Sequence, residues 1–312
     1  MGQLPAAPDP EALRGVAFGV AAYLLWGFFP AFFKLVKHVS PLEVVAHRIL
    51  WSCLFLLLLT VLSGAGRGVL KLLRDKKKAG LLMVSTLFIS ANWGIFIYAV
   101  ETDRVLESSL GYFINPLLSV FLGFLFLGER PSRGQTLSLF LAAAGVLYLA
   151  LGYGTFPWIA LSLAFSFGFY GLVRKKTRVD SLNGLLIETA LILPVALAWL
   201  IYLKLSGENA FLGGSLRTDL LLAASGVLTA IPLIWFNAAA LRLRLMTIGF
   251  LQYLTPTFHF ILAVWAYGEP FSRHHLICFG LIWTGLAIYS MEGLRLGARA
   301  ASLPPSHSRP IS

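Results

Sequence analysis

Long hydrophobic stretches alternate along this chain with short polar segments. Six of these stretches contain no Asp, Glu, Lys or Arg: 15–33, 79–100, 108–128, 134–154, 220–241 and 245–268. A helix needs about 20 apolar residues to cross a hydrocarbon core about 30 Å thick. The pattern therefore predicts an all-α polytopic membrane protein.

Loops and charges divide the chain into ten predicted transmembrane helices. Span 2 has the clearest start, because Ser40 suits the N-cap, Pro41 the first helical position, and Glu43 completes a capping box. Asp180 is an equally good N-cap for span 7. The ten spans are about 15–33, 42–62, 79–100, 107–127, 134–153, 156–173, 181–203, 219–241, 246–268 and 275–292.

The basic residues between the spans predict the orientation of the chain. One side carries 18 of the 25 Lys and Arg residues, including the clusters at 67–78 and 174–178, and the opposite side carries 6. Because Lys and Arg accumulate in cytoplasmic loops, both termini are expected in the cytoplasm. The net charge of +11 is explained in the same way, and does not indicate nucleic-acid binding.

The sequence contains none of the common catalytic or nucleotide-binding motifs. There is no Walker P-loop, zinc-protease or serine-hydrolase pattern. Cys53 and Cys278 both fall inside predicted spans and form no metal-binding pattern. We therefore expect no enzyme activity, no cofactor and no metal, and we expect membrane lipid and a small molecule as partners.

The two halves of the chain repeat at a constant offset of 140 residues. Pro116 corresponds to Pro256, Gly128-Glu129 to Gly268-Glu269, and Gly145 to Gly285. The predicted organisation is a polar tail (1–13), a first five-helix repeat (14–153), a second repeat (154–293) and a cytoplasmic tail (294–312). An odd number of spans in each repeat requires the second to be inverted, an arrangement typical of secondary transporters, although some channels share it.

Three stretches carry a resemblance to a known family: "AYLLWGFFPAFFK", "EVVAHRILWS" and "ESSLGYFINPLLSVFLGFLFLGER". They resemble the EamA family of the drug/metabolite transporter superfamily, and within it the RarD-type permeases, over nearly the whole chain. The resemblance implies a permease of the cytoplasmic (inner) membrane, expected to export a small metabolite or drug-like compound. The alternatives are a membrane channel and a non-transporting scaffold.

Arg48 and Glu188 are the charged residues well inside predicted spans, and the offset pairs them. Each lies eight residues beyond its N-cap, Ser40 or Asp180, which at 1.5 Å per residue is about 12 Å into the membrane. One hypothesis is that they flank the transport pathway, with Arg48 binding an anionic or polar group and Glu188 coupling transport to protons. The other is a buried ion pair that fixes helix register, or separate bonds to backbone carbonyls.

Further polar and aromatic residues inside spans are candidates for the substrate pathway. They suit a cavity wall, but interhelical hydrogen bonding would explain them equally. His47 fits a helix contact as well as a ligand, and His259 fits a satisfied interior histidine better. The set is His47, Asn92, Trp93, Tyr112, Asn115, Trp235, Asn237, Gln252, Tyr253 and His259.

Two prolines and two glutamates related by the 140-residue offset are the last residues to which we assign a role. Pro116 and Pro256 each remove a helical hydrogen bond, and their symmetry makes them predicted hinges. Glu129 and Glu269 end spans 4 and 9, where we expect them to organise the following turn rather than contact substrate.

Overall fold

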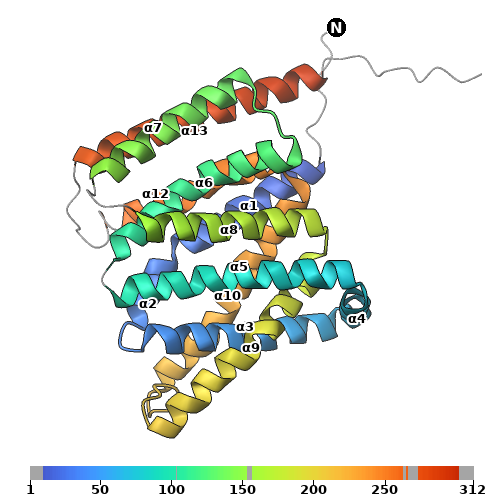
Figure 1. Cartoon of the computed structure of the whole chain (residues 1–312), viewed down its shortest axis with the longest axis vertical. Coiled ribbons are helices and arrows are strands. Elements are labelled where there is room, and N and C mark those ends of the chain that lie inside the picture. The colour runs from blue at the N-terminus through green and yellow to red at the C-terminus, as the bar shows by residue number, and fades with distance from the viewer. Residues whose placement is uncertain (1–9, 103, 153–156, 263–264, 266–272, 302–312) are drawn as a thin grey trace, which may run out of the picture.

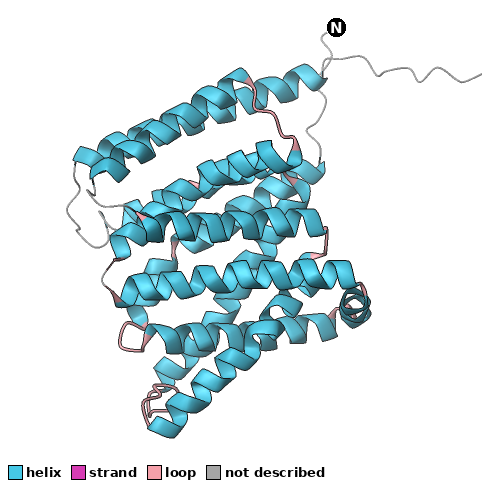
Figure 2. Cartoon of the chain, viewed as in Figure 1, coloured by secondary structure: helices cyan, strands magenta, loops and turns pink. Residues whose placement is uncertain are grey.

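The computed structural model describes residues 10–102, 104–152, 157–262, 265 and 273–301. Within these ranges the regular elements are helices and no strand occurs (Figure 2). They are α1 (Pro10–Gly27), α2 (Phe29–Leu35), α3 (Pro41–Leu62), α4 (Gly66–Arg74), α5 (Lys76–Glu101), α6 (Val105–Leu127), α7 (Arg133–Gly152), α8 (Trp158–Thr177), α9 (Ser181–Ser206), α10 (Leu216–Arg242), α11 (Leu245–Gln252), α12 (Leu254–Ile261) and α13 (Arg273–Ala301).

Eight of the ten predicted spans correspond to single helices, and spans 1 and 9 are each divided in two. Span 1 breaks at Phe28, where Pro30 lies in the first turn of α2. Span 9 breaks at Tyr253, between α11 and α12 and three residues before Pro256. Proline lacks the backbone N–H that would continue the helix, which explains why each break lies within three residues before a proline.

The two divided spans pack against each other. The Thr255 hydroxyl of α12 donates to the Tyr23 carbonyl of α1 at 2.9 Å. A Cβ on Gly27 would lie 2.6 Å from Cβ of Phe258, so only glycine allows this approach. The ends of two broken helices therefore meet inside the bundle.

Helix α4 lies in the segment that the sequence assigned to a basic loop. Figure 1 shows it end-on, so it runs across α3 and α5. Leu70 and Leu73 are each 52% exposed, and Arg67, Lys71 and Arg74 are interspersed with them. Such an amphipathic element is typical of a helix at the membrane surface.

Three helices in each half begin at positions 140 residues apart. Pro41, Lys76 and Val105 begin α3, α5 and α6, and Ser181, Leu216 and Leu245 begin α9, α10 and α11. Helices at equivalent positions pack together as α3 with α9, α6 with α11, and α7 with α13.

The glycines Gly145 and Gly285 mark the close approach of α7 and α13. A Cβ on Gly145 would lie 3.0 Å from the Cys278 carbonyl oxygen, and one on Gly285 would lie 2.9 Å from that of Ser138. Ser138 and Cys278 are themselves 140 residues apart, so the two contacts are equivalent.

The predicted N-caps are confirmed, whereas two glutamates have unexpected partners. Ser40 accepts a bond from the Glu43 amide at 3.3 Å, and Asp180 accepts from the amides of residues 182 and 183. The Glu43 carboxylate does not complete the capping box; it accepts from the amides of Ala210 and Phe211 in the α9–α10 connection.

Glu129 binds the start of another helix rather than its own turn. Its carboxylate oxygens accept from the amides of Leu245 and Met246, at 2.7 and 2.9 Å. A carboxylate at a helix N-terminus satisfies free N–H groups and interacts favourably with the helix dipole. The expectation about its own turn was wrong for Glu129, and Glu269 lies outside the described residues.

The connections rich in Lys and Arg lie at one end of the helices, and those with few Lys and Arg lie at the other. In Figure 1 the start of α1, α4 and the α8–α9 connection are at the right, and α2 and the α9–α10 connection are at the left. Among the described residues, six helical segments are long and apolar enough to cross a membrane, and shorter apolar helices accompany them.

Candidate functional site

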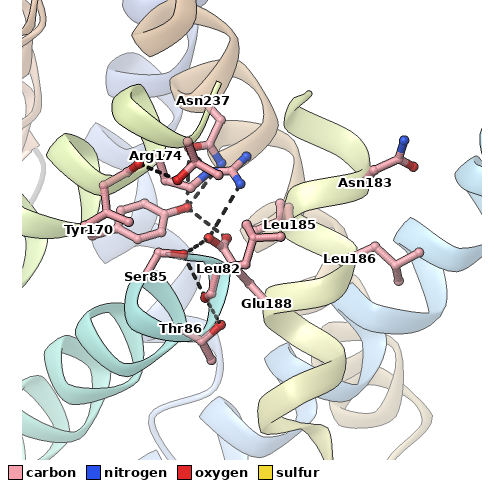
Figure 3. Close-up of polar contacts among 12 residues, drawn as sticks. Leu82, Ser85, Thr86, Tyr170, Arg174, Asn183, Leu185, Leu186, Glu188 and Asn237 are labelled. Carbon is pink, nitrogen blue, oxygen red and sulfur yellow. Dashed lines mark hydrogen bonds and ion pairs between the residues drawn. The ribbon is translucent and has the colours of Figure 1, made fainter. Parts of the chain in front are cut away.

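A buried polar network surrounds Glu188 and joins four helices (Figure 3). The carboxylate accepts bonds from the hydroxyl of Ser85 on α5 and from that of Tyr170 on α8, the latter at 3.3 Å. Nη1 of Arg174 lies 3.6 Å from the same carboxylate, and Nε of Arg174 donates to Asn237 on α10 at 3.0 Å. Both charges are thus balanced within the network.

Arg174 is the unexpected member of this network. The sequence assigned it to a basic loop, but it lies in the last turn of α8, and the residue is 2% exposed. Tyr170 and Arg174 are four residues apart and share one face of α8, which directs both side chains toward α9. A Cβ on Gly184 would collide with the guanidinium, so this glycine makes room for it.

Arg48 lies among aromatic rings and has a hydroxyl as its hydrogen-bond partner. Its Nε donates to Thr229 of α10 at 2.8 Å. Its guanidinium carbon is 5.7 Å from the ring centre of Phe29, 5.4 Å from that of Phe33 and 5.9 Å from that of Trp93. We call these four residues and Arg48 the Arg48 cluster. Its members come from α2, α3, α5 and α10.

Arg48 and Glu188 do not form the ion pair that their matched positions indicated as one alternative. Helices α3 and α9 do pack together, as that alternative required. Glu188 instead pairs with Arg174, and Arg48 bonds Thr229. The two residues nevertheless make equivalent contacts. Arg48 of α3 bonds Thr229 of α10, and Glu188 of α9 bonds Ser85 of α5. The 140-residue offset relates α3 to α9 and α5 to α10.

Two other predicted pathway residues connect helices. Asn92 of α5 donates to the Leu163 carbonyl and to the Ser166 hydroxyl of α8, at 3.0 and 2.9 Å. Tyr253 donates to the carbonyl of Phe113, its equivalent under the 140-residue offset, at 3.3 Å. For these two residues the structure supports the alternative of interhelical hydrogen bonding.

Three predicted residues are buried with polar atoms that make no hydrogen bond. These atoms are Oδ1 of Asn115, Oε1 of Gln252 and both ring nitrogens of His47. The His47 ring packs 4.6 Å from that of Phe211, and its Nε2 is 3.9 Å from Oε1 of Glu43. These groups remain candidates for contact with a bound molecule.

The remaining candidates have simpler surroundings. Trp235 packs against the main hydrophobic core, and Tyr112 is half-buried on α6, where it interacts electrostatically with Arg48. His259 belongs to α12, but its side chain lies outside the described part of the chain. Pro116 lies within α6, and Pro256 is in the first turn of α12. Their role as hinges stays a prediction.

Six residues of the Arg48 cluster and of the network around Glu188 were not predicted from the sequence: Phe29, Phe33, Ser85, Tyr170, Arg174 and Thr229. One feature of the sequence could have indicated Ser85: the offset of 140 pairs it with Ser225, which lies one helical turn before Thr229. The four-residue spacing of Tyr170 and Arg174, which places both on one helix face, could have indicated those two.

Comparison with known proteins identifies the class to which this bundle belongs. A solved structure titled "Crystal structure of protein" superposes with a TM-score of 0.70 at 19% identity, covering 90% of this chain and 99% of that one, which shows a shared fold. The EamA-like transporter family matches residues 13–151. Together with the apolar helices, this defines a multi-pass integral membrane protein of transporter type.

Relatives similar over nearly their full length make the assignment narrower. "Protein RarD" of Salmonella typhi is 46% identical over 91% of this chain and 97% of its own length. "Protein RarD" of Escherichia coli strain K12 is 44% identical over 91% and 96%. "Chloramphenicol-sensitive protein RarD" of Pseudomonas aeruginosa is 31% identical over 91% and 95%. The chain belongs to the EamA family of drug/metabolite transporters, as a RarD-type permease.

Proposed function

We propose that this protein is a secondary-active exporter of a small metabolite or drug-like compound in the cytoplasmic (inner) membrane. The chain would cross the membrane ten times, as α1 with α2, α3, α5, α6, α7, α8, α9, α10, α11 with α12, and α13. Both termini and α4 would face the cytoplasm. The excess of Lys and Arg at that end of the helices supports this orientation.

Transport would proceed by alternating access between two inverted five-helix repeats. The equal offset of three helix starts and the packing of equivalent helices support a repeat. Two copies of one fold in opposite orientation can adopt slightly different conformations and exchange them, which opens a central site to each side in turn. The broken helices α1–α2 and α11–α12 would belong to the moving parts, with Pro116 and Pro256 as hinges.

The Arg48 cluster is the proposed substrate site, and one observation carries this proposal. Arg48 is a partly exposed arginine on a membrane-crossing helix, and no described residue supplies a carboxylate within 4 Å of it. Charged residues inside membranes are costly, and those that persist face a partner, a cavity or a ligand. Helices from both repeats form the cluster, as expected for a site between two moving halves.

Glu188 is the proposed coupling group for protons. It is buried, and its carboxylate binds Arg174 and two hydroxyl groups. Protonation would remove the attraction to Arg174 and weaken the connection between α8 and α9. A proton taken up from one side and released on the other would thereby drive the exchange between states.

Purified protein in proteoliposomes tests this function. A pH gradient should drive flux of a labelled compound from a broad metabolite panel, and Arg48→Ala should abolish that flux. The double variant Glu188→Gln with Arg174→Gln should leave exchange of labelled for unlabelled substrate while uncoupling flux from the gradient, since neither buried charge remains. A scaffold would move nothing in either assay, and a channel would show only downhill flux, without accumulation driven by the pH gradient.

A further inference from the structure

The positive charge of Arg48 has no carboxylate within 4 Å among the described residues, whereas the buried carboxylates of Glu188 and Glu43 are already bound. Glu188 is held by Arg174, Ser85 and Tyr170, as Figure 3 shows. Glu43 accepts two backbone amides of the α9–α10 connection. An uncompensated charge in a low-dielectric interior is unfavourable, so an anion that binds there is stabilised.

Among the described residues, the Arg48 guanidinium makes a hydrogen bond through Nε alone. Thr229 accepts the bond from Nε, and no described residue accepts one from the two terminal nitrogens. The rings of Phe29, Phe33 and Trp93 surround the group at 5.4–5.9 Å. A guanidinium held at Nε still presents parallel N–H donors from its other edge, the arrangement that binds a carboxylate with two hydrogen bonds.

We propose that the Arg48 cluster binds the carboxylate of a small organic acid whose apolar body lies against Phe29, Phe33 and Trp93. This inference rests on the proposed function, since it names the substrate class of the same site. One arginine balances one negative charge, which selects a monoanion over a phosphate ester. A cationic amine is repelled by Arg48, and a neutral sugar brings no negative charge to balance it.

Matched pairs of compounds test the substrate class without relying on any variant. Benzoate, phenylacetate and hexanoate each have a carboxamide of nearly equal shape and no charge. Binding is measured on the full detergent-purified chain from the shift of its thermal unfolding with ligand concentration. At least one acid should bind about tenfold or more tightly than its amide, because charge-assisted hydrogen bonds are the stronger ones. Equal binding of acid and amide in all three pairs overturns the proposal.

Two variants then assign the preference to Arg48. Arg48→Gln should remove the difference between acid and amide, and Arg48→Lys should retain part of it because the charge remains but the planar fork is lost. Tighter binding of benzylamine than of benzoate by the parent would also contradict the assignment.

Failure of the substrate class and failure of the transport function give different results. Preference for an acid without flux in proteoliposomes would retain the anion site and reject the transporter. Flux of other compounds without any acid preference would retain the transporter and reject the carboxylate.

Discussion

Arg174 and Glu188 form a buried ion pair, with Nη1 3.6 Å from Oε1 and side chains that are 2% and 1% exposed. The pair connects α8 to α9 within a network that also includes α5 and α10. A buried pair contributes less than its Coulomb attraction indicates, because both ions lose their hydration. Loss of one partner is much more damaging, because it leaves the other charge alone.

Glu188→Ala should therefore destabilise the protein strongly. The expected loss is about 3–5 kcal/mol, the range for removing one member of a buried pair. The double variant Glu188→Gln with Arg174→Gln should be closer to the parent, since neither charge remains. Thermal unfolding of the purified variants in detergent measures both effects.

Two comparisons show whether the effect belongs to this pair. Glu11→Ala removes an exposed carboxylate that contacts Arg14 and Arg242, and should leave the unfolding temperature unchanged. The effects of Arg48→Ala and Glu188→Ala should be additive, because these two residues share no contact. Strong coupling between Arg48 and Glu188 would mean that they pair after all.

Gly285→Ala should weaken the contact of α7 with α13, although alanine favours helices. The new methyl group would lie 2.9 Å from the Ser138 carbonyl oxygen, and overpacking of this kind costs about 1–3 kcal/mol. Gly280→Ala on the same helix is the matched control, because its Cβ would meet nothing within 4 Å. Gly280→Ala should be neutral or stabilising by up to about 1 kcal/mol. Equal unfolding temperatures for the two variants would contradict the close approach.

Glu43→Ala should loosen the connection between α9 and α10. It leaves the amides of Ala210 and Phe211 without their acceptor, and an unsatisfied buried group costs about 1–3 kcal/mol. Hydrogen exchange at residues 210–211 should become faster. Asp219→Ala is the control, because its carboxylate accepts the Leu212 amide in the same connection and should affect mainly that residue. Unchanged exchange at 210–211 would show that Glu43 does not hold the connection.

Much of the fold could be predicted from the sequence because charge-free runs and N-caps are local signals. Ser40 and Asp180 begin α3 and α9 as expected, and most spans are single helices. The breaks at Phe28 and Tyr253 were less visible, because proline inside a membrane helix can kink it or divide it. Helix α4 was missed because its leucines are few and its basic residues dominate the segment.

The partners of the two central charges could not be predicted, for a physical reason. The offset fixes which residues are equivalent, but contact depends on side-chain direction and on the neighbouring helices. Arg174 lay at the end of a span, where a basic residue usually meets water or lipid headgroups. Its burial depends on Gly184 of α9, a contact between helices that no local pattern encodes.

Thr229→Val should reduce the preference of the protein for carboxylates while leaving its fold intact. Valine keeps the branched shape but removes the oxygen that accepts a bond from Nε of Arg48, so the guanidinium loses its fixed orientation. The ratio of acid to amide affinity should fall several-fold in the thermal-shift titration. Thr86→Val is the matched control, because Thr86 is also buried and its hydroxyl bonds a carbonyl of its own helix, as that of Thr229 does. An unchanged ratio in Thr229→Val would show that Thr229 does not position Arg48 for its ligand.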